Sequence, residues 1–130
     1  MLHTEELVAL ASINEETKKF QKELNSGTTA LVLLGILGQT SKPMYGYEIA
    51  KLIEAKVKDI PIMKQGALYP VLRSLESSGL LESEVEPSVS SPPRRYYRIT
   101  ENGRKTLESW REIWDQTKAL VDNVMHGGEQ

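Results

Sequence analysis

Apolar residues recur at steps of three and four from Leu7 to Leu24, so they share one face of a helix. We predict an amphipathic helix over residues 4–25, ended by the poor helix formers of residues 25–27. A nearly continuous apolar run follows, and its length and glycine content favour a second, buried helix over residues 28–37. Because the first helix exposes a long apolar face, it needs a partner to cover it.

The middle of the chain changes from helical to strand-like patterns. Amphipathic helices are predicted over residues 45–56 and 65–78. Residues 80–86 alternate in part between apolar and polar positions, and residues 94–99 are rich in aromatic and branched side chains, which is typical of strands. The segment between them, residues 87–93, consists mainly of serine and proline. Two strands around one loop predict an antiparallel hairpin.

A last amphipathic helix is predicted to begin at Thr100, a residue type that caps helices, and to end near Met125. Its apolar stripe has steps of three and four in alternation, which is the spacing of a seam between two helices. The stripe consists of Leu107, Trp110, Trp114, Thr117, Val121 and Val124. We expect this helix and the first one to pack together across two subunits.

This order of elements predicts a mainly α protein with a two-stranded β-wing, namely a winged helix-turn-helix with N- and C-terminal dimerisation helices. We divide the chain into an N-terminal amphipathic helix (residues 1–27), a winged helix-turn-helix DNA-binding domain (residues 28–102) and a C-terminal dimerisation helix (residues 103–130). In such a fold a helix fits the major groove of duplex DNA, and the hairpin reaches the backbone or the neighbouring groove. Residues 65–78 would form that recognition helix.

Composition narrows the chemistry. The 130 residues include no cysteine, which excludes disulfides and thiolate metal sites. The sequence has no cluster of metal-ligating residues, no glycine-rich phosphate loop and no nucleophile motif, so we expect no metal, no cofactor and no enzyme. No apolar run approaches the roughly 20 residues of a membrane helix, and the first residues do not resemble a signal peptide. We therefore expect a cytoplasmic protein that does not use a membrane.

The charges are unevenly distributed, although the net charge is only −2. Residues 42–105 hold 11 of the 16 basic residues and 8 of the 18 acidic ones, a balance of +3, whereas the flanks have a balance of −5. A basic centre between acidic ends favours DNA contact by the centre, and ordinary surface scatter explains it equally well. The alternative function is a winged-helix protein–protein adaptor without DNA binding, which the acidic flanks favour and the basic wing opposes.

Three motifs in order resemble the PadR family of transcriptional regulators. They are MYGYEI at residues 44–49, QGALYPVLRSLESSGLL at residues 65–81 and RRYYRITENG at residues 94–103. The resemblance covers residues 30–103 and, in outline, the terminal helix. It implies a homodimer that binds double-stranded DNA at a palindromic operator and represses transcription, with release by a small molecule in some members.

Candidate DNA contacts lie on the predicted recognition helix and on the wing. Backbone amides at the start of that helix favour phosphate, and arginines after two prolines can be presented to a narrow, negative groove. The alternatives are a packed Tyr69, an Arg73–Glu76 pair on the surface and solvated wing arginines. The candidates are Lys64, Gln65, Gly66, Tyr69, Arg73, Arg94, Arg95 and Arg98.

Trp110 and Trp114 lie one helical turn apart and are candidates for a small aromatic effector, because two such rings can form a flat-walled slot. In a drug-sensing branch of the resembled family, a tryptophan of this helix stacks on planar compounds. Trp114 fits that position better than Trp110 does. The alternative is that both rings belong to the core or the subunit interface. The candidate dimer interface comprises Leu7, Leu10, Phe20, Leu107, Trp110, Trp114, Val121 and Val124.

Overall fold

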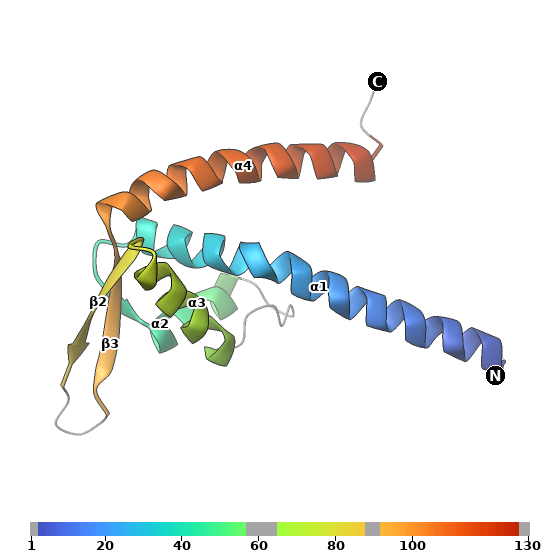
Figure 1. Ribbon diagram of the computed structural model, residues 1–130, viewed down its shortest axis with the longest axis horizontal. Coiled ribbons are helices and arrows are strands. Elements are labelled where there is room, and N and C mark those ends of the chain that lie inside the picture. Colours follow the sequence, from blue (N-terminus) through green and yellow to red (C-terminus); the bar gives the residue numbers. More distant parts are fainter. Residues whose placement is uncertain (1–2, 57–64, 88–91, 128–130) are drawn as a thin grey trace.

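The structure, a computed structural model, describes residues 3–56, 65–87 and 92–127 (Figure 1). Within these ranges the chain is mainly helical and carries a small antiparallel sheet with strand order β1-β3-β2. This confirms the predicted mainly α class with a β-wing. The elements are α1 Thr4–Gln39, β1 Met44–Tyr45, α2 Gly46–Lys56, α3 Gln65–Ser77, β2 Leu81–Glu86, β3 Arg94–Ile99 and α4 Glu101–Met125.

The hydrophobic core lies where the second half of α1 meets α2, α3, the sheet and the first turns of α4. Leucine side chains of α1 and α3 are at its centre, because the apolar stripe of α3 and the continuous apolar run of α1 face each other there. The side chains that are fully buried are Leu33, Leu34, Leu37, Ile49, Leu68, Leu72 and Leu81.

One continuous helix, α1, replaces the two helices expected over residues 4–25 and 28–37, so the predicted end at residues 25–27 is wrong. The Thr28 hydroxyl donates to the carbonyl of Leu24 at 2.8 Å, so this polar side chain is accommodated within the helix. Gly27 costs only about 1 kcal/mol relative to alanine in a helix, which is too little to break one whose second half is anchored in the core. The expected boundary at residue 27 lies inside α1.

A third strand, β1, was not predicted. Tyr45 was expected to begin a helix, but it pairs with Tyr96 of β3, and α2 begins at Gly46. A two-residue strand has too few positions to show an alternating pattern, so only its partner reveals it.

The remaining predicted elements are confirmed with small changes at their ends. The hairpin β2–β3 aligns Leu81 with Ile99 and Glu86 with Arg94. Gly79, at φ +80°, follows the end of α3. The Thr100 hydroxyl caps α4 by accepting a hydrogen bond from the Gly103 amide at 3.0 Å.

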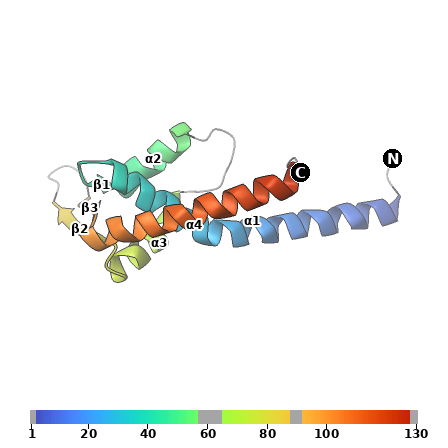
Figure 2. The same ribbon diagram turned by 90° about the horizontal axis from the view of Figure 1, so that it is seen from above.

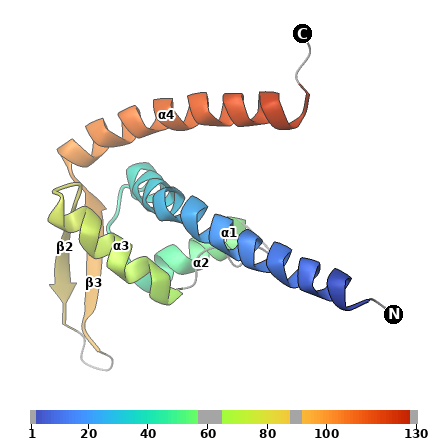
Figure 3. The ribbon, with the colours of Figure 1, turned by 45° about the vertical axis from the view of Figure 1, so that its right-hand side comes forward.

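Helices α1 and α4 meet near the core and then diverge (Figures 1 and 3). The N-terminal end of α1 projects beyond the end of α4 (Figure 2). Leu107 lies in the core at 7% exposure, because it packs beside Gly38 at the end of α1, and this corrects its assignment to the dimer interface. Farther out, both helices expose large apolar side chains: Leu7, Val8, Leu10, Ile13, Phe20, Leu24, Ile113, Trp114, Leu120, Val121, Val124 and Met125.

None of the helices in the described part of the chain is long and apolar enough to span a membrane.

Two glycines of the helices differ sharply in their surroundings, which gives a matched test of the fold. A Cβ at Gly27 would meet nothing within 4 Å, so Gly27→Ala should stabilise the protein by about 0.5–1 kcal/mol. A Cβ at Gly103 would overlap the carbonyl oxygen of Leu80, so Gly103→Ala should destabilise it by about 1–3 kcal/mol. Denaturant unfolding measures both. A destabilised Gly27→Ala would contradict the continuous α1.

Candidate nucleic-acid interface

Helix α3 has a buried face and an opposite, exposed face. Its buried stripe, Leu68, Leu72 and Leu75, packs in the core and thereby orients the whole helix. Helical spacing then places the exposed positions together on the outward side. Because most of them are small, the helix backbone can approach a partner closely. They are Gly66, Ala67, Pro70, Arg73, Ser74 and Ser77.

Tyr69 lies on the flank of α3 instead of its outward face. Its ring is half-buried and packs against Gly46, where even a methyl group would overlap the ring. The Tyr69 ring is therefore packed, as the alternative to a DNA contact predicted. A side chain at residue 46 would overlap this ring, so the glycine there allows α2 to begin beside it. Tyr69 also faces the hollow described next.

A hollow of about 280 Å³ separates the outward side of α3 from the wing. Arg73 borders it from α3, and Arg94 and Arg95 border it from β3. Its lining therefore combines cationic groups with phenol rings, a composition that suits an anionic ligand. The full lining is Tyr45, Gly46, Tyr69, Arg73, Pro93, Arg94, Arg95 and Tyr97.

Burial raises the pKa of the Tyr97 phenol, and the negative charge of Glu76 raises it further. The positive charges of Arg95 and Arg73 act in the opposite direction. Glu76, Arg73 and Arg95 therefore all lie within electrostatic reach of one ring at the floor of the hollow.

The three arginines of β3 have different partners. The guanidinium of Arg94 lies over the Tyr45 ring, 4.6 Å from its centroid. Arg95 Nη1 donates to the Ser83 hydroxyl at 2.9 Å. Arg98 Nε donates to a Glu82 carboxylate oxygen at 2.6 Å, and this hydrogen bond, with the attraction of the two charges, raises the pKa of Arg98. Of the three, Arg98 is the one whose charge is directly offset by a carboxylate.

The two faces of the wing carry opposite charge. Side chains alternate along β2, so Glu82, Glu84 and Glu86 share the face that points away from Ser83, and all three are exposed. Arg98 and Arg94 also belong to this face, because they pair with Glu82 and Glu86 in the sheet register. Arg95 belongs to the face toward α3, with Ser83 and Tyr97.

An aromatic cluster, Tyr45, Tyr47 and Tyr96, supports the base of the wing and was not predicted. The Tyr45 and Tyr96 rings meet edge to face at 5.3 Å between centroids, and Tyr45 and Tyr47 stack at 6.3 Å. Lys51 lies over Tyr47, 5.4 Å from the ring centroid. The signal in the sequence was the pair of tyrosines around Gly46, but only the β1–β3 pairing places Tyr45 under Arg94.

Two predicted contacts at the start of α3 cannot be placed. Lys64 lies outside the described residues, and of Gln65 the structure describes the backbone, as the first residue of α3, but not the side chain. Gly66 is exposed on the outward face. Glu76 was the partner of Arg73 in the alternative interpretation. In the structure, its carboxylate accepts a hydrogen bond from the Ser83 hydroxyl at 2.6 Å.

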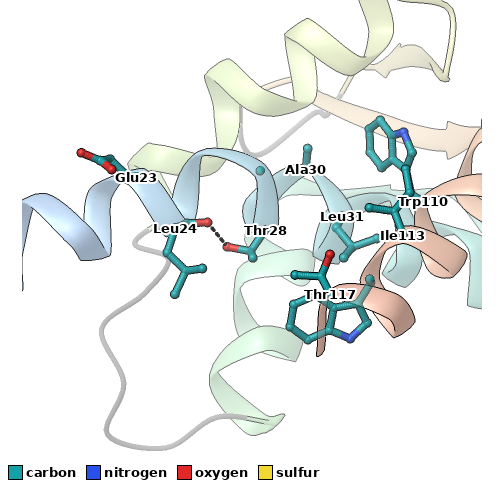
Figure 4. A pocket seen from close by; sticks show the side chains of 10 residues that line it. Glu23, Leu24, Thr28, Ala30, Leu31, Trp110, Ile113 and Thr117 are labelled. Atoms are coloured by element: carbon teal, nitrogen blue, oxygen red, sulfur yellow. Dashed lines mark hydrogen bonds between the residues drawn. The ribbon is translucent and has the colours of Figure 1, made fainter. Parts of the chain in front are cut away.

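A second, mainly apolar groove of about 490 Å³ lies between α1 and α4 (Figure 4). Trp110 is half-buried against the core, whereas Trp114 is 40% exposed, and both border the groove. The groove coincides with the low-propensity segment of α1, where the Thr28–Leu24 hydrogen bond lies (Figure 4). The lining is Glu23, Leu24, Gly27, Thr28, Ala30, Leu31, Trp110, Ile113, Trp114 and Thr117.

Among the residues that the structure describes, no group of three or more histidine, cysteine, aspartate or glutamate side chains is placed to hold a metal ion.

The comparisons with known proteins agree on one family of transcriptional regulators. The Transcriptional regulator PadR-like family matches residues 33–109. The crystal structure of a PadR family transcriptional regulator from Eggerthella lenta is 34% identical, with a TM-score of 0.67 over 92% of this chain and 98% of that one. A transcriptional regulator from Clostridium thermocellum is 30% identical, with a TM-score of 0.68 over 78% of this chain and 93% of that one.

An uncharacterized HTH-type transcriptional regulator from Methanothermobacter thermautotrophicus is 48% identical over 71 residues, which are 55% of this chain and 53% of that protein. The matched residues 33–109 include the core of α1, the outward face of α3 and the complete wing. The chain therefore belongs to the PadR-like family, whose members are DNA-binding transcriptional regulators with a winged helix and are not enzymes.

Proposed function

We propose that the protein is a cytoplasmic homodimer that binds a palindromic operator through α3 and the wing, represses transcription there, and is released by a small planar ligand. One observation carries the DNA-binding part: Arg73, on the outward face of α3, and the wing arginines Arg94 and Arg95 border the same hollow. A helix that presents small side chains beside unneutralised guanidinium groups suits the major groove and its flanking phosphates.

The dimer part of the proposal is supported by exposed apolar stripes. Single exposed apolar residues are common, but contiguous stripes mark an interface. Leu7, Leu10 and Phe20 on α1 and Val121 and Val124 on α4 are each at least 46% exposed. In a dimer these stripes cover each other, and Trp110 and Trp114 line the same seam.

A two-fold dimer presents two copies of α3, so its operator has two related half-sites. Half-sites read from one side of the duplex lie one turn apart, roughly 34 Å. Occupation of such a site blocks access of the transcription machinery, which is the physical basis for repression.

The groove between α1 and α4 is the proposed effector site, because its walls are apolar and include both tryptophans. Within one subunit, Leu7, Leu10 and Ile13 are exposed and do not line this groove, which leaves room beside Trp114. A planar molecule wedged there changes the spacing of the two α3 helices, and by linkage DNA and ligand then weaken each other equally.

Binding to duplex DNA should weaken steeply with salt, because each arginine contact to a phosphate releases a counterion. Arg94→Ala and Arg95→Ala should each lower affinity for all sequences and reduce the salt slope by about one. Arg98→Ala should have a smaller effect, since Glu82 offsets its charge. Gel shifts over a salt series measure these changes. Absence of salt-dependent binding by the unmodified protein would favour the adaptor function.

Val121→Glu should convert the dimer to monomers and lower DNA affinity, because a charge would enter the apolar seam. Ala119→Glu is the matched control: Ala119 is exposed and lies on the opposite side of α4. Light scattering after size-exclusion chromatography gives the oligomeric state. Truncation after Asn102 is a poorer test, because it also removes Leu107 from the core. An unchanged dimer in Val121→Glu would contradict the interface.

Planar aromatic dyes should quench tryptophan fluorescence, and this readout is specific because the chain has only two tryptophans, both at the groove. Quenching should largely disappear in Trp114→Ala, and the same dyes should release DNA from the unmodified protein. If quenching persists in Trp114→Ala, the Trp114 ring does not hold the dye; if bound dye leaves DNA affinity unchanged, the groove is not the effector site.

A further inference from the structure

Three polar side chains connect the recognition helix with the wing. The Ser83 hydroxyl donates to Glu76 Oε2 of α3 at 2.6 Å and accepts from Arg95 Nη1 of β3 at 2.9 Å. Glu76 and Ser83 are half-buried, whereas Arg95 is exposed at the edge of the hollow. The carboxylate therefore determines the direction of the hydroxyl, and the hydroxyl determines where the guanidinium lies.

This relay holds the arginine without neutralising it directly. A guanidinium has five N–H donors, and the hydrogen bond to Ser83 uses one of them. A neutral hydroxyl stands between the guanidinium and the carboxylate, unlike the direct ion pair of Arg98 with Glu82 on the opposite face. Within the part of the chain that the structure describes, Ser83 is the hydrogen-bond partner of Arg95, so the remaining donors can face a ligand in the hollow.

The ligand can be specified by chemistry. Arg73 borders the hollow from α3, and Arg95 borders it from the wing, so the two residues share one space of about 280 Å³, and both act electrostatically on Tyr97. Two guanidinium groups beside one small space, with phenol rings nearby, match the oxygens of a single phosphate group. A base edge is a poorer match, because two arginines from different elements do not form one planar, bidentate pair with it.

We propose that the hollow binds one backbone phosphate of DNA between Arg73 and Arg95, and that Ser83 and Glu76 are positioning residues that hold Arg95 there. This rests on the proposed DNA-binding function and adds a phosphate site and its support. Because Ser83 connects the wing to α3, the wing contact and the recognition helix keep one fixed spacing on the DNA.

Fluorescence anisotropy with a fluorescein-labelled, random-sequence DNA duplex at low salt tests the proposal, since a phosphate contact does not depend on sequence. Ser83→Ala should weaken binding about 3- to 10-fold, the range of one lost hydrogen bond. Ser83→Thr, which keeps the hydroxyl, should restore it. Ser109→Ala, at an exposed position of α4, is the matched control and should bind like the unmodified protein.

A double-mutant cycle separates positioning from a general structural role. If Ser83 acts through Arg95, the variant with both Ser83→Ala and Arg95→Ala binds no more weakly than Arg95→Ala alone. Glu76→Gln and Glu76→Ala remove the same charge, so the difference between them reports hydrogen bonding to Ser83, and we expect tighter binding by Glu76→Gln. Thermal unfolding of each variant checks that it is folded.

Several results would overturn the proposal. Equal or tighter binding by Ser83→Ala would mean that the relay does not present Arg95 to DNA. Additive losses in the cycle would give Ser83 and Arg95 independent roles. Unchanged affinity of Arg73→Ala would remove the second guanidinium from the phosphate site. Each of these leaves the DNA-binding function intact, whereas failure of the unmodified protein to bind the duplex would refute that function itself.

Discussion

The packing of α3 against the second half of α1 is the constraint on which the rest of the structure depends. Leu68 and Leu72 are fully buried against leucines of α1, so α3 can have only one rotation about its axis. That rotation sends Arg73 outward and Tyr69 toward the wing, and it carries Glu76 to the side where Ser83 lies. Burial of a few apolar side chains thus determines which polar groups face DNA.

The wing extends this constraint to a second element. Alternation along β2 and β3 separates a face with Ser83 and Arg95 from a face with three glutamates. The glutamates blunt the outer edge strand against pairing with other chains, and they repel DNA from that side. In the proposed complex, the same alternation that forms the hairpin therefore favours a duplex on the side of α3.

The sequence predicted most of the elements but not their contacts. Strands β2 and β3, helices α3 and α4 and the Thr100 cap are visible in local patterns, because each depends on residues near one another in the chain. The continuity of α1 across Gly27 depends on anchoring from the distant core, and β1 depends on a partner some fifty residues away, so neither has a local signal. The relay through Ser83 was missed for the same reason, because its three members come from three elements.

The unbroken α1 also affects how a ligand in the proposed effector site would act on DNA binding. Two helices joined by a loop at residue 27 would let the terminal half of α1 move without disturbing α3. A single helix makes the groove at Gly27 and the core contacts near Leu34 parts of one rod. A ligand that displaced this rod where it faces Trp114 of α4 would therefore move α3 together with the wing, which is connected to α3 through Ser83. In the proposed dimer, this coupling turns a change in the seam between subunits into a change in the spacing of the two recognition helices.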